Sequence, residues 1–253
     1  MTALLLGDLT GRSRVALRML CAALEARGHE VLMLPTALVS NTLSLGRCAT
    51  LDTTDYLLDA LRVWQELGIR CDIAYIGYIT GTRQAQALCG VADALRAAGV
   101  RVILDPILGD NGKRYNSVTD DQLAGMRLLM AHADLITPNR TEAFLLSGVP
   151  FGGEADAALA RNLAGDKRSV LITGARTPAG GDAVLGFDAQ AGEPFAVPFD
   201  RVPGAFFGTG DLFTALLMDG LLAGRTIRES AADACAHVAA QLRGEEARLI
   251  PQA

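Results

Sequence analysis

Short apolar runs alternate with segments of helical periodicity along almost the whole chain, and this alternation is the feature that most limits the fold. The runs at 3–6 and 31–34 are typical, because each is apolar on both of its sides. A strand without a polar side must be covered on both faces, as in parallel sheets whose crossover connections are helices. We therefore expect an α/β fold, a three-layer sandwich in which helices cover both faces of a central, mostly parallel sheet.

The same periodicities place the expected elements along the sequence. Strands are expected at 3–6, 31–34, 73–78, 101–104, 135–137 and 170–173, with a hairpin formed by 181–187 and 194–199. Helices are expected at 14–27, 55–67, 83–98, 121–131, 142–146, 155–164, 211–223 and 227–242, and a loop at 36–53. No shift in composition and no internal repeat divides the chain, so a single domain over 1–253 is expected.

Composition argues against several classes of protein. The formal net charge is −5, so we expect no nucleic-acid partner, because binding to a phosphate backbone needs clustered Lys and Arg. No apolar stretch reaches the roughly 18–20 residues of a membrane span, and the N-terminus lacks the basic leader of a signal peptide. The five cysteines are dispersed, without a Cys-x-x-Cys pair, which is typical of free thiols and not of a zinc site. These features predict a cytoplasmic protein.

Polar and glycine-rich motifs follow the predicted strands, each at the carboxyl end of its strand. They are Gly7-Asp8, Gly77-Tyr78, Asp105-Pro106, Thr137-Pro138-Asn139 and Thr173-Gly174. Ligands of open parallel sheets bind beyond the carboxyl ends of the strands, so we expect one edge to carry nearly all the chemistry. Asp8 also fits a simpler role, as a cap for the turn formed by Thr10 and Gly11.

The run Gly208-Thr209-Gly210-Asp211 precedes an apolar stretch suited to a buried helix. Backbone N–H groups at a helix start are unpaired and the helix dipole is positive there, so such a start binds anions. A phosphoryl group in transfer needs donors for its equatorial oxygens, and the attacking hydroxyl needs an acceptor for its proton. A simpler interpretation is that Thr209 caps the helix and Asp211 complements its dipole.

Asp105, Asp110 and Glu142 are candidate ligands for Mg²⁺, which prefers a few carboxylates together with waters and nucleotide phosphates. Asn139 and Glu142 also have the spacing of a capping box, with Asn139 as N-cap and Glu142 three residues on. The two interpretations are compatible, since capping would fix the geometry while an exposed carboxylate oxygen of Glu142 faces the water shell of the metal.

Taken together, these motifs resemble those of the vitamin B6 kinases, the pyridoxal, pyridoxine and pyridoxamine kinases of the ribokinase-like superfamily. The matching segments, in the family's order, are Gly77-Tyr78, Asp105-Pro106-Ile107-Leu108-Gly109-Asp110-Asn111-Gly112-Lys113, Thr137-Pro138-Asn139-Arg140-Thr141-Glu142-Ala143 and Pro203-Gly204-Ala205-Phe206-Phe207-Gly208-Thr209-Gly210-Asp211. The resemblance implies an α/β sandwich without a separate lid domain, use of ATP and Mg²⁺, and a homodimer. The Gly-Thr-Gly-Asp element is shared by the wider superfamily, whereas the other two long segments narrow the choice toward B6 kinases.

The resemblance also implies roles for individual residues. Asp211 resembles the base that faces the 5′-hydroxymethyl group of the B6 vitamer, and Gly208, Thr209 and Gly210 resemble the anion hole for the γ-phosphate. The residues that resemble the metal and nucleotide side of the site are Asp105, Asp110, Glu142, Thr137, Asn139 and Thr173. Those that resemble the substrate side are Asp8, Tyr78, Ser40 and Asn41.

Two segments depart from the family and leave alternatives open. The segment 7–13 carries Arg and Ser where related sequences are richer in glycine and an aromatic residue, and 40–45 lacks a His-Thr pair found in many members. Phosphoryl transfer is therefore better supported than the identity of its acceptor. The alternatives are a hydroxymethylpyrimidine kinase, which resembles the pattern with Cys in place of Asp211, a sugar kinase, and a non-catalytic B6-binding protein.

Overall fold

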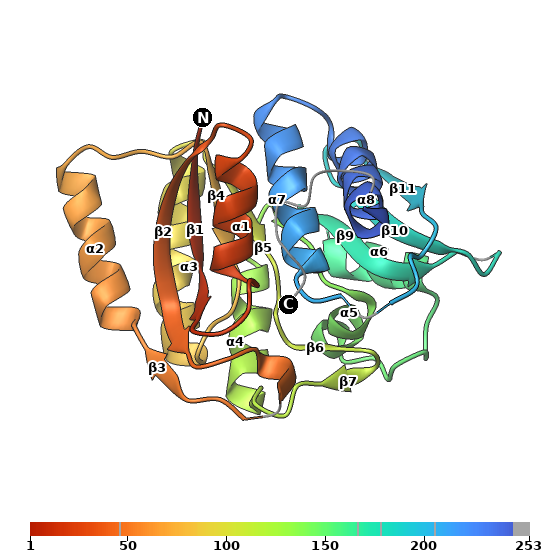
Figure 1. The fold of residues 1–253 in the computed structure, drawn as a ribbon, viewed down its shortest axis with the longest axis horizontal. Helices are drawn as coiled ribbons and strands as arrows, with labels where there is room; N and C mark the ends of the chain where they lie inside the picture. Colours follow the sequence, from red (N-terminus) through yellow and green to blue (C-terminus); the bar gives the residue numbers. More distant parts are fainter. Residues whose placement is uncertain (46, 166, 178, 205, 245–253) are drawn as a thin grey trace.

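The structure is a computed structural model that describes residues 1–244 except 46, 166, 178 and 205. One sheet of nine strands forms the middle layer, and helices cover both of its faces (Figure 1). The expected α/β sandwich with a mostly parallel sheet is confirmed. Ala205, which belongs to the segment that resembles the kinases before Gly208, lies outside the described residues.

The strand order in the large sheet is β11-β10-β9-β8-β5-β4-β1-β2-β3. The six central strands, from β9 to β2, run parallel, while β10, β11 and β3 add antiparallel edges. The strands are β1 (Thr2–Thr10), β2 (Glu30–Val39), β3 (Thr50–Asp52), β4 (Ile73–Ile76), β5 (Arg101–Leu104), β8 (Leu135–Ile136), β9 (Ser169–Arg176), β10 (Asp182–Asp188) and β11 (Glu193–Pro198). A separate two-stranded ribbon consists of β6 (Gly109–Asp110) and β7 (Lys113–Arg114).

The helices divide between the two faces of the sheet. Those on one face are α1 (Leu17–Glu25), α7 (Thr209–Leu222) and α8 (Ile227–Arg243). Those on the other face are α2 (Thr54–Glu66), α3 (Thr82–Ala97), α4 (Asp120–Met130), α5 (Arg140–Ser147) and α6 (Asp156–Ala164). Within the described part of the chain, no helix is long and apolar enough to cross a membrane.

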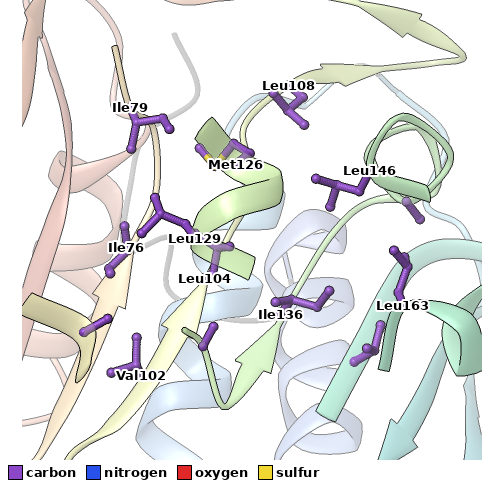
Figure 2. Close-up of a cluster of buried hydrophobic side chains, with 14 of the residues drawn as sticks. Ile76, Ile79, Val102, Leu104, Leu108, Met126, Leu129, Ile136, Leu146 and Leu163 are labelled. Atoms are coloured by element: carbon purple, nitrogen blue, oxygen red, sulfur yellow. The ribbon is translucent and has the colours of Figure 1, made fainter. Parts of the chain in front are cut away.

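Side chains of the central strands alternate between two hydrophobic cores, as the lack of a polar side predicts. In β4, Ile73 and Tyr75 face the core beneath α1, α7 and α8, while Ala74 and Ile76 face the opposite core. Figure 2 shows part of this second core, where Ile76 packs with side chains from the sheet and from α4 to α6. Because both faces are buried, a one-residue slip of any central strand would exchange the two cores.

The chain reverses direction across the sheet between β1 and β4. From β1 it moves outward to β2 and β3, and it then returns through β4 toward β5, β8 and β9. Crevices at such switch points, beyond the carboxyl ends of the strands, are the usual ligand sites of open α/β sheets. The β6–β7 ribbon contacts α5 near this edge (Figure 1).

The expected loop at 36–53 is wrong in two places. β2 continues to Val39 because β1 itself extends to Thr10 and keeps pairing with it, past a register shift after Gly7. The segment then contains a short 3₁₀ turn (Leu43–Leu45) and β3, which pairs with the end of β2. Long-range pairing therefore decides the structure here, against a polar sequence that suggests a loop. The first helix begins at Leu17 and not near residue 14.

The close approach of α7 and α8 gives a test of the packing. A Cβ added to Gly220 of α7 would lie 2.8 Å from Cβ of Ser230 in α8, whereas one added to Gly90 of α3 meets no atom within 4 Å. We expect Gly220→Ala to lower the unfolding free energy by about 1–3 kcal/mol through overpacking. Gly90→Ala, as the control, should raise it by about 0.5–1 kcal/mol through helix propensity. Urea unfolding of both variants measures this, and equal effects would contradict the packing described.

Candidate functional site

Four carboxyl groups lie near one another at the carboxyl edge of the sheet. Asp8 belongs to β1, Asp105 follows β5, Glu142 belongs to α5 and Asp211 lies in the first turn of α7. Asp8, Asp105 and Glu142 are buried, and Asp211 is partly exposed. Burial, together with the charge of Asp211, raises the pKa of both Asp8 and Asp105 to about 7. The cluster therefore resists carrying its full negative charge at neutral pH.

Hydroxyl groups of neighbouring residues interact with the Asp105 carboxylate. Thr214 Oγ1, one turn along α7 from Asp211, donates to Asp105 Oδ2 at 3.3 Å. The hydroxyls of Thr137, Thr214 and Tyr75 each lower the pKa of Asp105, though by less than burial raises it. Thr137 Oγ1 nevertheless makes no hydrogen bond of good geometry with any described residue. This buried polar atom is available to a ligand at the edge.

The start of α7 is open, as an anion site requires. Gly208 is the N-cap, with a φ of 78°, and no side chain caps the helix. The interpretation of Thr209 as the cap is therefore wrong, because Thr209 is already the first helical residue. The positive φ favours glycine at 208, and a Cβ there would also lie 3.3 Å from the backbone carbonyl oxygen of Arg14. Among the described residues, no side chain accepts from the first-turn N–H groups of α7.

Asp211 takes its position from the loop that precedes α1. The backbone N–H of Ala16 donates to Asp211 Oδ2 at 2.8 Å, across almost the whole length of the chain. Burial raises the pKa of Asp211, and this hydrogen bond lowers it. The carboxylate is thus held at one oxygen by a backbone donor.

Asn139 and Glu142 form the expected capping box of α5. The Asn139 side chain accepts from the Glu142 N–H at 3.1 Å, and Glu142 Oε2 accepts from the Asn139 N–H at 2.8 Å. Glu142 Oε1 accepts from the Leu108 N–H at 3.1 Å. The expectation that one oxygen of Glu142 stays exposed is wrong, because both oxygens bind backbone N–H groups. Burial and the charge of Asp105 hold the pKa of Glu142 well above its usual range.

The residues expected on the nucleotide side come from three places: Thr137 and Asn139 lie between β8 and α5, Thr173 lies in β9, and Asp110 lies in β6. Asn139 pairs with Thr173 in a parallel bridge, so the two are neighbours at the edge of the sheet. Asn139 Nδ2 also donates to the Gly109 carbonyl at 2.8 Å and thereby ties the ribbon to α5. Asp110 lies on that ribbon, exposed, with its carboxylate bound to the N–H and the side chain of Asn111.

The residues expected on the substrate side fall into two groups. Asp8 lies within β1 and not after it, and it caps no turn, since Gly11 N–H donates to the Val39 carbonyl. Tyr78 is buried with Val39 and Leu43 in a small third core.

Ser40 and Asn41 are occupied within their own loop. Ser40 Oγ donates to Asn41 Oδ1, and Asn41 Nδ2 donates to the carbonyl groups of Thr42 and Arg47.

No three side chains of His, Cys, Asp or Glu are placed to hold a metal ion, among the residues that the structure describes. Asp105, Asp110 and Glu142 are therefore not assembled as a three-carboxylate site. Mg²⁺ in nucleotide sites commonly uses one or two carboxylates plus phosphates and waters, so the donor set at this edge still fits the ion.

Three contributors to the site have no motif in the sequence. Tyr75 looks like a core residue of β4, yet it interacts with the cluster: burial, and then the charges of the four carboxyl groups, raise the pKa of Tyr75, and its hydroxyl lowers that of Asp105. A Cβ at Gly77 would lie 2.5 Å from that hydroxyl, and the spacing Tyr-x-Gly is the only signal in the sequence. The sequence predicts Thr214 as a core residue of its helix. Ala16 acts through its backbone, and no feature of the sequence indicates that role.

Comparison with known proteins identifies the family of the chain. The model of the phosphomethylpyrimidine kinase family matches residues 23–250. The chain is 32% identical over 226 residues to a pyridoxine/pyridoxal/pyridoxamine kinase of Bordetella bronchiseptica, covering 83% of this chain and 77% of that protein.

Two solved structures share the fold. One, from Bacteroides thetaiotaomicron, is provisionally described as a phosphomethylpyrimidine kinase and was crystallised with pyridoxal; the TM-score is 0.88 at 28% identity, over 96% of this chain and 87% of that one. The other is a pyridoxal kinase of Lactobacillus plantarum, with a TM-score of 0.83 at 26% identity, over 96% and 88%. The resemblance to the B6 kinases is thus confirmed, and the chain belongs to the phosphomethylpyrimidine kinase family, with the ribokinase-like fold of its pyridoxal kinase relatives.

Proposed function

We propose that this protein transfers the γ-phosphoryl group of ATP to the 5′-hydroxymethyl group of pyridoxal, pyridoxine or pyridoxamine. The observation that carries the proposal is the uncapped start of α7, where free N–H groups and the Asp211 carboxylate lie together beside Asp8 and Asp105. This combination supplies an anion site and a proton acceptor at one point. The Bordetella relative is named for the three vitamers, and the Bacteroides relative was crystallised with one of them.

Asp211 is the proposed proton acceptor. Burial raises its pKa, but a carboxylate remains a much weaker base than an alkoxide, so Asp211 orients the hydroxyl and accepts the proton late in the transfer. Gly208, Thr209 and Gly210 bind the equatorial oxygens of the phosphoryl group through their N–H groups. Asp8 and Tyr78 line the vitamer pocket, and we expect Ser40 and Asn41 to close it once they exchange their present hydrogen bonds for the substrate.

ATP and Mg²⁺ are proposed for the neighbouring part of the edge. Thr137, Asn139 and Thr173 would contact the phosphates, and Asp110 would approach them from the ribbon. A bound Mg²⁺ would neutralise phosphate charge, with Asp105 and Asp110 as its carboxylates. Glu142 would contribute mainly charge, because both of its oxygens already accept from backbone N–H groups.

We also propose that the protein works in the cytoplasm as a homodimer, as the resemblance to the B6 kinases implies. One observation supports a covered surface: Leu38 and Leu51 form an exposed cross-strand pair at the β3 edge of the sheet, where apolar side chains and unpaired backbone groups favour association.

A panel of acceptors tests the function. The purified protein should form product with ATP and at least one of pyridoxal, pyridoxine and pyridoxamine, measured as the phosphate ester by chromatography. Hydroxymethylpyrimidine belongs in the panel, because the family is named for the phosphomethylpyrimidine kinases. Faster turnover of the pyrimidine than of any vitamer would reassign the acceptor, and binding without any turnover would favour the non-catalytic alternative.

Asp211→Asn should reduce kcat by about 10²–10⁴-fold, the usual cost of losing a general base. The asparagine oxygen can still accept from the Ala16 N–H, so the melting temperature and ATP affinity should change little. Asp93→Asn, an exposed carboxylate on α3 whose partner is His132, is the matched control and should keep its turnover. A turnover of Asp211→Asn near that of the parent would remove Asp211 from the proposed role.

Asp8→Asn should change how stability depends on pH. The pKa of Asp8 is about 7 in the folded protein, against the ordinary value of 3.8 that applies to the unfolded chain. Between these two pH values the folded protein holds a proton that the unfolded chain releases. The resulting stabilisation is present at low pH and is lost as the pH rises toward 7. Removing the carboxyl should flatten the slope of unfolding free energy by up to about 1.4 kcal/mol per pH unit between about pH 5 and pH 7. Urea titrations at several pH values measure it.

Asp8→Ala tests recognition of the vitamer, because alanine removes the acceptor that asparagine would keep. Loss of a buried acceptor costs about 1–3 kcal/mol, so KM for the vitamer should rise about 5- to 150-fold while KM for ATP stays nearly constant. An unchanged KM for every vitamer would show that Asp8 does not contact the substrate, whatever its effect on stability.

A further inference from the structure

The loop between β1 and α1 holds a backbone conformation that its sequence disfavours. Ala16 has φ 52° and ψ −135°, and Ser13 has φ 73°, although neither residue is glycine. Positive φ in a residue with a Cβ costs of order 1–3 kcal/mol and persists only where the surroundings enforce it. Such strain calls for a structural reason close to the strained residue.

The surroundings of Ala16 enforce its conformation from both sides. Its carbonyl accepts the N–H groups of Met19 and Leu20, so the residue is fixed to the first turn of α1. The same loop lies against the N-cap of α7: a Cβ at Gly208 would lie 3.3 Å from the Arg14 carbonyl oxygen and 2.9 Å from Met19 Cε. With its carbonyl directed into α1, the N–H of Ala16 is turned toward α7.

That N–H donates to Asp211 Oδ2 at 2.8 Å. In the described part of the chain, Asp211 Oδ1 has no hydrogen-bond partner. A hydrogen bond to the charged form of a carboxyl group lowers its pKa, which is the direction of the effect of Ala16 on Asp211. One oxygen is therefore fixed, and the other remains free to face an acceptor hydroxyl.

We propose that Ala16 is a positioning residue for the phosphoryl transfer: its strained backbone directs an N–H group that orients the Asp211 carboxylate. The proposal rests on the function proposed above, in which Asp211 accepts the proton. Ala16 itself touches neither nucleotide nor vitamer in this account, and it acts only through Asp211. The role explains why a non-glycine residue is kept in a conformation that glycine would adopt without strain.

Ala16→Val tests the proposal, because a β-branched side chain opposes the positive φ most strongly and should turn the N–H away. We expect kcat to fall about 10- to 150-fold, the factor that corresponds to a lost hydrogen bond to a charged group, with KM for ATP and vitamer nearly unchanged. Ala16→Gly keeps the N–H donor, and glycine adopts this backbone conformation without strain. The kcat of Ala16→Gly should therefore stay close to that of the parent. Ser13→Val strains the same loop at a residue whose N–H does not bind Asp211, and it should lower stability more than kcat.

A double-mutant cycle separates this role from a general effect of the loop. In an Asp211→Ala background, which lacks the acceptor of the Ala16 N–H, Ala16→Val should cost less than about threefold further, measured over long incubations. Losses that multiply, or a rise in KM in place of a fall in kcat, would overturn the proposal.

Amide hydrogen exchange keeps the proposal testable if Ala16→Val does not fold. The Ala16 N–H should be protected in the parent and should lose protection in Asp211→Ala. Unprotected exchange in the folded parent would overturn the positioning role. If the parent phosphorylates no vitamer at all, the proposed function fails instead, and the exchange experiment still reports on the hydrogen bond.

Discussion

Mutual repulsion among four buried or partly buried carboxyl groups is the constraint on which the rest of this structure depends. Asp8, Asp105, Glu142 and Asp211 meet at one edge of the sheet, and the charge of each raises the pKa of at least one neighbour or of the tyrosine beneath them. Such a group of charges is unfavourable in an empty site and favourable once cationic or hydrogen-bonding ligands arrive. This balance suits the proposed function, in which a metal–nucleotide complex and an alcohol bind at this edge.

Hydrogen-bond donors from separate parts of the chain offset the repulsion among these carboxyl groups. Glu142 accepts backbone N–H groups from two segments, Asp105 has the Thr214 hydroxyl, and Asp211 has the N–H of Ala16. These donors are supplied by a helix start, a buried helix face and a strained loop. Leu108 packs in one core, and Ala16 is bound to the first turn of α1, so the electrostatics of the site depend on the same contacts that stabilise the fold.

The sequence predicts the fold well because its evidence is local and repeated. Apolar runs without a polar side and glycines after helices placed most elements within a few residues, and the capping box at Asn139 was readable from spacing alone. It predicts the site less completely. The extension of β2 to Val39 depends on pairing with β1, and the burial of Glu142 depends on where the Leu108 N–H lies. Tyr75 and Ala16 could not be predicted as site residues for a similar reason. The sequence does not show that an aromatic residue of the core, or a backbone N–H group, interacts with a carboxyl group.

Helices α1 and α7 are joined at both ends. Ala16 binds Asp211 at the site, and beyond the other end of α1, Arg27 and His29 both bind Asp219, two turns further along α7. The spacing between the two joints must therefore match on both helices. A single inserted or deleted residue in either helix would rotate its far joint by about 100° and break the match, although it touched no residue of the site. The interior of α1 should thus tolerate substitutions far better than insertions or deletions. The length of α1, more than its sequence, helps to fix the position of the Asp211 carboxylate.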